Sequence, residues 1–288
     1  MKKALFVLNP ASGRQNFWNE VEGIIGCLVL NGIINQVDVA YTKQRYDARA
    51  ATASLRYGQY DFIVAVGGDG TVNDVVNGVI KSGSRIPLAV LSVGLENSFA
   101  DSLRLPSGKE DFCQMIKAFK TVAVDIGRIN GQYFINTVAG GIGTDLSYRA
   151  DGETKAVLGR KAYFLEGLKT LPGQFFASMD LYFDSEEFTG TRDTVMFSVN
   201  NSRPADCDGL MEVLIFEKMP MAQFVRAIWK SSRNNHDQAP HVRRFKTKKI
   251  KIHSINDIQA PVNADGEMFG TLPLELECVP EAVEVIVP

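Results

Sequence analysis

The sequence predicts two parts, a doubly wound α/β domain over residues 1–121 and an antiparallel β-sandwich domain over residues 122–288. In the first part, short β-branched apolar runs alternate with stretches of helical spacing, as in a parallel sheet covered by helices on both faces. After about residue 121, strand candidates become more numerous and long helical patterns fewer. A length of 288 residues fits two domains.

The first part begins with an apolar strand over 4–8, which the turn Asn9-Pro10-Ala11-Ser12-Gly13 ends. A helix over about 17–30, a strand over 37–41 ended by Thr42, and a helix over about 47–57 follow. Two more strands follow, at 61–66 and 87–91, and the first leads directly into a helix. The polar turns after these strands fall at the carboxyl edge of the predicted sheet, where α/β proteins bind ligands.

The central stretch, residues 61–78, reads DFIVAVGGDGTVNDVVNG. It predicts a strand, a turn with three glycines around Asp69, and a helix with apolar residues on one face. Such a turn lets the backbone approach a phosphate, and the helix N-terminus favours an anion there. A plain strand-to-helix turn is the simpler alternative. An aspartate beside a phosphate requires a cation, water or a transferable proton, so Asp69 favours metal-assisted phosphate chemistry.

The second part contains short strand candidates and two predicted helices, at about 161–171 and 221–231. The strand candidates are 121–130, 132–138, 178–183, 194–200, 210–216, 249–253 and 259–263. Residues 274–288 alternate weakly and predict two more strands. Residues 243–253 hold a run of basic side chains, which fits either an exposed charged hairpin or a patch for anionic lipid headgroups.

Composition limits the functional classes. The net charge is −2, from 31 basic and 33 acidic side chains, so no nucleic-acid partner is expected. No apolar run is long enough to span a bilayer, and the first residues do not form a signal peptide, so we expect a cytoplasmic protein. The four cysteines are scattered without a CxxC pair, which favours free thiols.

The segment GGDGTVNDVVNG resembles the glycine-rich motif of the diacylglycerol kinase catalytic domain, whose superfamily includes sphingosine kinases and bacterial lipid kinases. NAD kinases share a shorter form, and the continuation through Asn77-Gly78 favours the lipid kinases, although Asp74 stands where that family usually has glutamate. The NPASG turn, Asp125-Ile126-Gly127 and Asp265-Gly266-Glu267 extend the resemblance over nearly the whole chain. It implies a nucleotide-binding α/β domain beside a β-sandwich, and a C-terminus that can pack back on the first domain.

The resemblance also implies cofactors and site residues: ATP, Mg²⁺, and a lipid substrate met at a membrane surface by a peripherally associated protein. The implied nucleotide contacts are Asn9, Ser12, Gly13, Thr42, Gly67, Gly68, Asp69, Gly70, Thr71, Asn73 and Asn97. Asp265 is the candidate catalytic base, with Glu267 in support, although sphingosine kinases assign that role to the aspartate matching Asp69. An isolated Asp-Gly is more often a plain hairpin turn. Asp208, with the Leu210 carbonyl and Ala205, is the candidate structural Mg²⁺ site, and a metal-free turn is equally open.

One segment departs from the family pattern. The loop after the fourth strand is usually GTGND and here is Gly94-Leu95-Glu96-Asn97-Ser98, which loses a hydroxyl, adds a charge and drops a carboxylate. Two hypotheses follow. One is an ATP-dependent lipid kinase of phospholipid biosynthesis that converts diacylglycerol to phosphatidic acid. The alternative is a weakly active or inactive homologue that binds a lipid or nucleotide. A soluble-substrate kinase of the NAD kinase type is less favoured, and a homodimer stays open.

Overall fold

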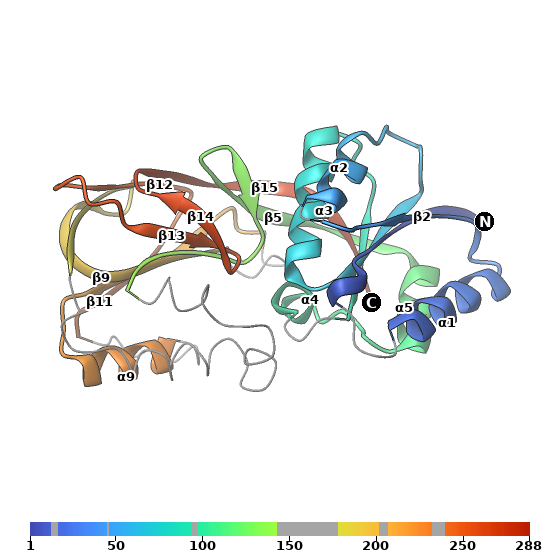
Figure 1. Ribbon diagram of the computed structural model, residues 1–288, viewed down its shortest axis with the longest axis horizontal. Helices are drawn as coiled ribbons and strands as arrows, with labels where there is room; N and C mark the ends of the chain where they lie inside the picture. Colours follow the sequence, from blue (N-terminus) through green and yellow to red (C-terminus); the bar gives the residue numbers. More distant parts are fainter. Residues whose placement is uncertain (13–16, 45, 94–96, 143–177, 202–206, 232–239) are drawn as a thin grey trace. The chain divides into compact units, whose positions relative to one another are not determined.

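The computed structural model describes residues 1–12, 17–44, 46–93, 97–142, 178–201, 207–231 and 240–288, and its contacts group the chain into two compact units (Figure 1). Unit 1 comprises Met1–Ile126, Arg203–Asp208 and Val279–Pro288, and unit 2 comprises Gly127–Ser202 and Gly209–Cys278. Strands β5 (Lys120–Ile129) and β15 (Leu274–Val287) each have residues in both units.

Unit 1 is built on a parallel sheet. Its strands lie in the order β2 (Ile34–Tyr41), β1 (Lys2–Leu8), β3 (Phe62–Gly67) and β4 (Leu88–Ser92). The end of β15 extends this sheet, because Val285 pairs in parallel with Leu88. Strand β3 is buried along its whole length, as expected where helices cover both faces of a parallel sheet.

The helices of unit 1 cover both faces of its sheet, so the predicted doubly wound arrangement is confirmed. Helices α1 (Phe17–Leu30) and α5 (Lys109–Ala118) share one core cluster with Phe6 and Val64 of the sheet. Helices α2 (Asp47–Ala53) and α3 (Asp69–Ser82) pack against each other, and Figure 1 shows them on the other side. Two short segments, the 3-10 turn η1 (Pro10–Ser12) and helix α4 (Ser98–Ser102), follow β1 and β4.

Unit 2 is an antiparallel β structure. One run of paired strands has the order β14 (Glu267–Thr271), β13 (Pro261–Ala264), β7 (Thr137–Gly141), β9 (Thr189–Asn201), β8 (Met179–Asp184), β12 (Lys249–Ser254) and the first part of β15. Strand β9 is long: its first half pairs with β8, and its second half pairs with both β7 and β10 (Met211–Glu217). Strand β10 also pairs with β11 (Val242–Thr247), and β6 (Gln132–Phe134) pairs with β5.

The strands of unit 2 enclose one apolar core, to which Phe183, Phe197, Val213 and Leu276 contribute from four strands. This arrangement confirms the predicted β-sandwich. Helix α9 (Met221–Ser231) packs on a second, smaller cluster that contains Phe224 and Phe216. Within the described ranges, no helix is long and apolar enough to cross a bilayer.

Several element boundaries differ from the sequence predictions. The strand expected over 132–138 is two strands, β6 and β7, separated by Ile135 and Asn136. Residues 274–288 form one long strand instead of two, and α2 ends at Ala53. Helix α5 and strands β11 and β14 were not predicted, because each is short and strongly charged or glycine-containing. The helix expected over 161–171 lies outside the described residues.

Candidate active site

The carboxyl ends of the four parallel strands of unit 1 are tied together by backbone hydrogen bonds. The bonds run from Thr42 N–H to Leu8 O (2.9 Å), from Asn9 N–H to Val66 O (3.0 Å) and from Val93 N–H to Gly67 O (3.4 Å). The predicted convergence of polar turns at one edge of the sheet is therefore present for the described residues.

The glycine turn between β3 and α3 depends on close packing of its own backbone. A Cβ built on Gly67 would lie 2.4 Å from Oγ1 of Thr71, so only glycine fits where Thr71 folds back over the end of the strand. The Asn9 side chain donates to Oγ1 of Thr71 at 3.0 Å and accepts from the amide of Ala11 at 3.1 Å. Asn9 thus links the NPASG turn to the start of α3.

Asp69 is the first residue of α3, and its carboxylate connects two neighbouring turns. It accepts hydrogen bonds from the backbone amides of Ser98 at 3.0 Å and Phe99 at 3.3 Å. These amides belong to the first turn of α4, whose N-cap residue Asn97 makes no capping bond with its own side chain. Asp69 therefore supplies the cap for α4 from a different element.

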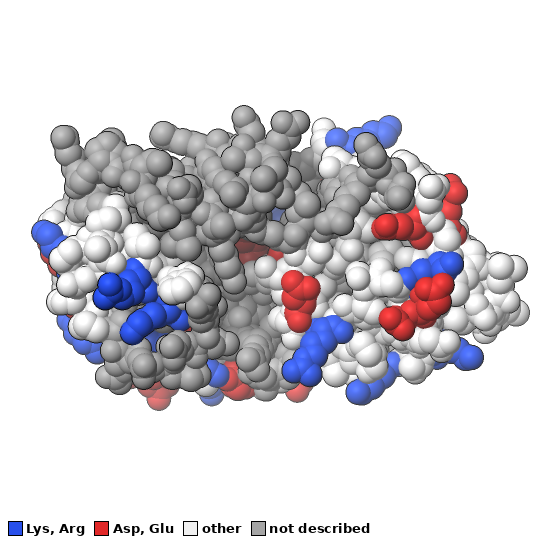
Figure 2. All heavy atoms as spheres, turned by 90° about the horizontal axis from the view of Figure 1, so that it is seen from below, with Lys and Arg blue, Asp and Glu red and all other residues white. Residues whose placement is uncertain are grey.

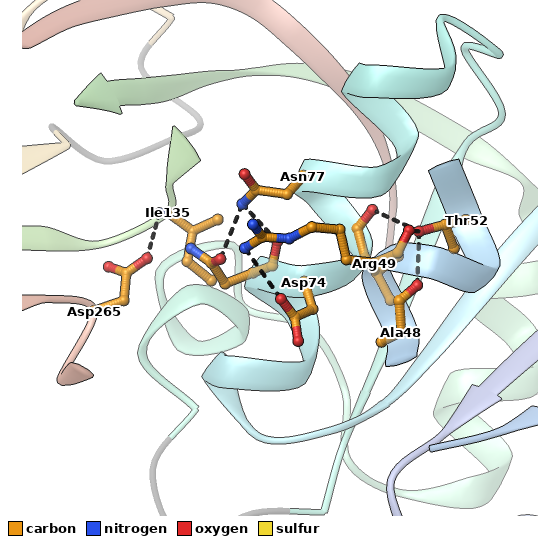
Figure 3. A network of polar contacts seen from close by, with 9 residues as sticks. Ala48, Arg49, Thr52, Asp74, Asn77, Ile135 and Asp265 are labelled. Carbon is orange, nitrogen blue, oxygen red and sulfur yellow. Dashed lines mark hydrogen bonds and ion pairs between the residues drawn. The ribbon is translucent and has the colours of Figure 1, made fainter. Parts of the chain in front are cut away.

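The second half of the glycine-rich motif packs α3 on α2. Asp74 forms an ion pair with Arg49 of α2 at 3.1 Å (Figure 3), with both side chains about three-quarters buried or more. Asn77 donates to the Asn73 backbone and side-chain oxygens, each at 2.9 Å. A Cβ on Gly78 would lie 1.9 Å from Oγ1 of Thr52. The part of the motif that continues beyond Gly67–Thr71 therefore serves the packing of α3 on α2.

A residue that sequence analysis missed lies at the end of β4. The hydroxyl of Ser92 is buried and makes no hydrogen bond to any described residue. A buried hydroxyl without a partner is costly, so it is available to a ligand group at this edge. Its position as the last residue of β4, at the carboxyl edge of the sheet, is the signal that could have identified it. The predicted loop residues 94–96 lie outside the described residues.

In unit 2, Asp265 occupies the tight turn between β13 and β14. Asp265 and Gly266 both have positive φ, 50° and 86°, between the paired residues Ala264 and Glu267. This geometry is a two-residue hairpin of the type that Asp-Gly favours, so the plain-turn description applies to the backbone. The Gly266 amide also donates to Oδ1 of Asn263 at 2.7 Å, which fixes the turn further.

The Asp265 side chain also binds a second segment of unit 2, residues 135–137. It is only 7% exposed, and its carboxylate accepts from three successive amides, of Ile135 (2.7 Å, drawn in Figure 3), Asn136 (2.8 Å) and Thr137 (2.9 Å). Three N–H donors facing one group fit an ionised carboxylate, and they occupy three of its roughly four acceptor positions. The carboxylate is held in one orientation with little capacity left for further acceptance. Glu267 is exposed on β14.

The predicted structural Mg²⁺ site lies only partly within the described residues. Asp208 is exposed, Leu210 is half-buried, and Ala205 lies outside the described ranges. Across the described part of the chain, no group of three or more His, Cys, Asp or Glu side chains could hold a metal ion. The carboxylate of Asp69 is bonded to backbone amides instead. Mg²⁺ binding therefore stays a prediction.

The structure gathers most of the predicted nucleotide residues at one edge of unit 1, namely Asn9, Thr42, Gly67, Gly68, Asp69, Gly70, Thr71 and Asn97. Asn73 lies one turn further along α3 and bonds to Asn77. Ser12 ends η1, and Gly13 lies outside the described residues.

Comparison with known proteins gives consistent matches over both units. Residues 3–129 match the sequence model of the diacylglycerol kinase catalytic domain, and residues 201–287 match that of the YegS C-terminal NAD kinase beta sandwich-like domain. A diacylglycerol kinase of Bacillus subtilis (strain 168) is 32% identical over 303 residues, which cover 100% of this chain and 97% of that protein. One of Staphylococcus aureus (strain MRSA252) is 30% identical over 296 residues, covering 100% and 93%.

A solved structure shares the fold. The crystal structure of a diacylglycerol kinase from Bacillus anthracis str. Sterne has a TM-score of 0.81 to this chain at 22% identity. The match covers 99% of this chain and 97% of that one.

Proposed function

The chain belongs to the diacylglycerol kinase family, and from that premise we propose that it transfers the γ-phosphate of ATP to the free hydroxyl of diacylglycerol, which gives phosphatidic acid. The family makes the chain an ATP-dependent kinase of the lipid kinase class, and the choice of diacylglycerol is our inference from the names of its relatives. The observation that carries the proposal is the group of turns around Asn9, Gly67 and Thr71 at the carboxyl edge of the unit 1 sheet.

In the proposed reaction, the acceptor hydroxyl oxygen attacks the γ-phosphorus of ATP. The bond from that phosphorus to the β–γ bridging oxygen breaks, ADP leaves, and the hydroxyl proton passes to a base. Mg²⁺ normally offsets the charge of the triphosphate in such reactions.

The residues of unit 1 have binding and orienting roles in this proposal. The glycine turn and the first amides of α3 face the edge where phosphates bind in α/β proteins. Asn9 and Thr71 hold two of the turns in register, and Asp69 holds the start of α4 against the start of α3. Ser92 offers a buried hydroxyl to the nucleotide.

Asp265 is the base in the proposal, and its setting favours that role in one respect. The three amides of 135–137 fix the carboxylate and favour its charged form, as a proton acceptor requires. The same amides occupy three of its acceptor positions. Asp69, the alternative base, is also bonded to two amides, so each of these carboxylates has a structural role in its own unit.

The second hypothesis, a weakly active or inactive homologue, rests on the Gly94–Ser98 loop of the sequence. Isothermal titration of the full chain with Mg-ATP separates the two. The kinase proposal expects binding below millimolar nucleotide, followed by transfer of labelled phosphate to diacylglycerol in mixed micelles. Absence of binding at millimolar Mg-ATP would overturn it. A panel of lipid acceptors in the same assay identifies the preferred hydroxyl.

Two variants test Asp265. Asp265→Asn should lower kcat by about 10²-fold or more, the usual contribution of a general base. The new amide group would also face three N–H donors and disturb the turn, so a matched control is needed. Asn263→Ala removes the 2.7 Å bond to Gly266 and disturbs the same hairpin while the Asp265 side chain itself is kept. Equal losses in both variants would assign Asp265 a structural role only.

A further inference from the structure

Two aromatic side chains of unit 1, Trp18 and Tyr41, form an exposed pair beside the carboxyl edge of the parallel sheet. Their ring centroids lie 5.8 Å apart, with an interplanar angle of 52°. Trp18 is 44% exposed and Tyr41 is 54% exposed. The Trp18 indole also meets the buried ring of Phe17 edge to face, at 5.2 Å. The pair is therefore anchored to the core at Phe17 and remains substantially exposed.

The strand register fixes the position of this pair on the sheet. Tyr41 is the last residue of β2 and pairs with Leu8 of β1, which also pairs with Val66 of β3. Tyr41 and Val66 are therefore level with each other on either side of β1, and the glycine turn begins directly after Val66. Leu8 packs in the core cluster of α1 and α5, so Tyr41 lies on the face of the sheet where α1 begins with Phe17 and Trp18.

The separation between the ends of β2 and β3 matches the length of a nucleotide. Neighbouring strands lie about 4.8 Å apart, so these two ends, with β1 between them, are about 10 Å apart. In an extended nucleoside triphosphate, a ribose and the α-phosphate separate the base from the β-phosphate, which is a comparable span. Asn9 and Thr42, at the ends of β1 and β2, lie along this path. A triphosphate on the glycine turn can therefore bring its base to the aromatic pair.

Charged surfaces offer a weaker candidate for a further site. Figure 2, which looks at unit 1 from the side of α1 and α5, shows acidic side chains next to basic ones there. In unit 2, the basic segment 243–253 is not a hairpin, because β11 pairs with β10 while β12 pairs with β15 and β8. Its cations lie beside carboxylates: Arg244 pairs with Glu212, and Lys249 with Glu275. These ion pairs reduce the field that an anionic lipid would encounter.

We propose that Trp18 and Tyr41 form the platform on which the adenine base of ATP stacks. The inference deepens the proposed function and rests on it, because it assigns residues to the base of the same nucleotide. Every nucleobase has a π face that stacks on aromatic side chains. The tilt between the two rings lets one ring lie against the base while the other meets its edge.

Position distinguishes this pair from a single exposed aromatic residue, which is common on protein surfaces. Tyr57 is more exposed, at 84%, but it belongs to the turn that leads into β3, at the amino edge of the sheet. Tyr57 is therefore a matched control for the loss of an exposed ring from unit 1.

The first test uses the fluorescence of Trp18, because the chain has two tryptophans and Trp18 is the only one left in a Trp229→Phe chain. Titration of this chain with Mg-ATP should change the Trp18 emission, and titration with Mg-tripolyphosphate, which has no base, should leave it nearly unchanged. An equal response to both ligands would contradict stacking. A change that follows protein concentration or lipid micelles without ATP would assign the pair to a second copy or to lipid, and would also overturn the proposal.

The second test measures affinity by isothermal titration. Trp18→Ala and Tyr41→Ala should each raise the Kd for Mg-ATP by about tenfold or more, as expected for a lost base–aromatic stack, and leave the Kd for tripolyphosphate unchanged. Trp18→Phe keeps a ring and should retain most of the ATP affinity, and Tyr57→Ala should change neither Kd. Circular dichroism checks that each variant is folded. An unchanged ATP affinity in both alanine variants, or equal losses for ATP and tripolyphosphate, would refute the platform.

The outcomes separate this inference from the proposed function. If ATP binding depends on Trp18 and Tyr41 while no phosphate is transferred to diacylglycerol, the platform stands and the kinase proposal fails. If transfer is normal and the alanine variants bind ATP as the unaltered chain does, the kinase proposal stands and the platform fails. Absence of ATP binding to the unaltered chain would refute both.

Discussion

Replacement of Gly78 by alanine should separate the packing role of the glycine-rich motif from its role in phosphate binding. Gly78 lies inside α3, and an added Cβ would be 1.9 Å from Oγ1 of Thr52 and 2.7 Å from the carbonyl oxygen of Arg49. Thr52 is fully buried, and its hydroxyl donates to the Ala48 carbonyl at 2.8 Å, so it has little freedom to move. The new methyl group would therefore push α2 away from α3.

The expected cost follows from overpacking. Forcing a methyl group into a packed site costs about 1–3 kcal/mol, and the higher helix propensity of alanine offsets up to about 1 kcal/mol of that. Gly26 is a matched control, because it lies inside α1 and a Cβ there would meet nothing within 4 Å. Gly26→Ala should raise the free energy of unfolding by up to about 1 kcal/mol. The same substitution should thus have opposite signs at the two sites.

The assay is urea unfolding of both variants in a Trp229→Phe chain, where the fluorescence of Trp18 reports on unit 1 alone. Circular dichroism gives the loss of helix in parallel. Mg-ATP titration of Gly78→Ala should also show weaker binding, because α3 begins at the glycine turn. A Gly78→Ala protein as stable as the Gly26→Ala protein would refute the claim that α2 and α3 are in contact at this glycine.

Three further predictions concern stability. Asp69→Ala should lower the free energy of unfolding by about 1–2 kcal/mol in urea, since α4 loses its cap, whereas Asp101→Ala on the exposed side of α4 should have little effect. Burial and a hydrogen bond with Cys27 raise the pKa of the Cys113 thiol to about 12 from 9.0. The unfolded chain loses that proton first, so stability should fall from about pH 9 to 12, and Cys113→Ala should remove this component of the alkaline slope. Asp74→Ala should cost about 1 kcal/mol through loss of the Arg49 pair, and Asp74→Glu should retain it.

The sequence was sufficient for the layered organisation of unit 1, because periodicity alone separates its buried strands from its helices. Helix α1 begins and ends at the predicted residues, and β3 is the apolar run before the glycine turn. Unit 2 was harder to predict. The bending of β9, which shares its two halves among three partners, depends on long-range pairing that local patterns do not encode.

The sequence indicated which residues to consider for the candidate site, but it did not indicate the contacts that they make. The resemblance selected Asp69 and Asp265, but it could not show that each carboxylate is bonded to backbone amides. Those amides lie 29 and 130 positions away in the sequence, so no local motif predicts the pairs. Ser92 was missed because a serine at the end of a strand is common, and only its burial makes it notable.

The contact of Asp69 with the first turn of α4 bears on the consequences of the unusual Gly94–Ser98 loop. Three side chains of that loop depart from the family pattern, yet the bonds from Asp69 reach the amides of Ser98 and Phe99. Any residue except proline supplies such an amide, so this anchor of α4 does not depend on the side chain at position 98. The departure at position 98 therefore leaves this anchor in place. A loss of nucleotide affinity would then come from side-chain chemistry, namely the missing hydroxyl at Leu95, the added charge of Glu96 or the missing carboxylate at Ser98, and single substitutions at those positions should be able to reverse it.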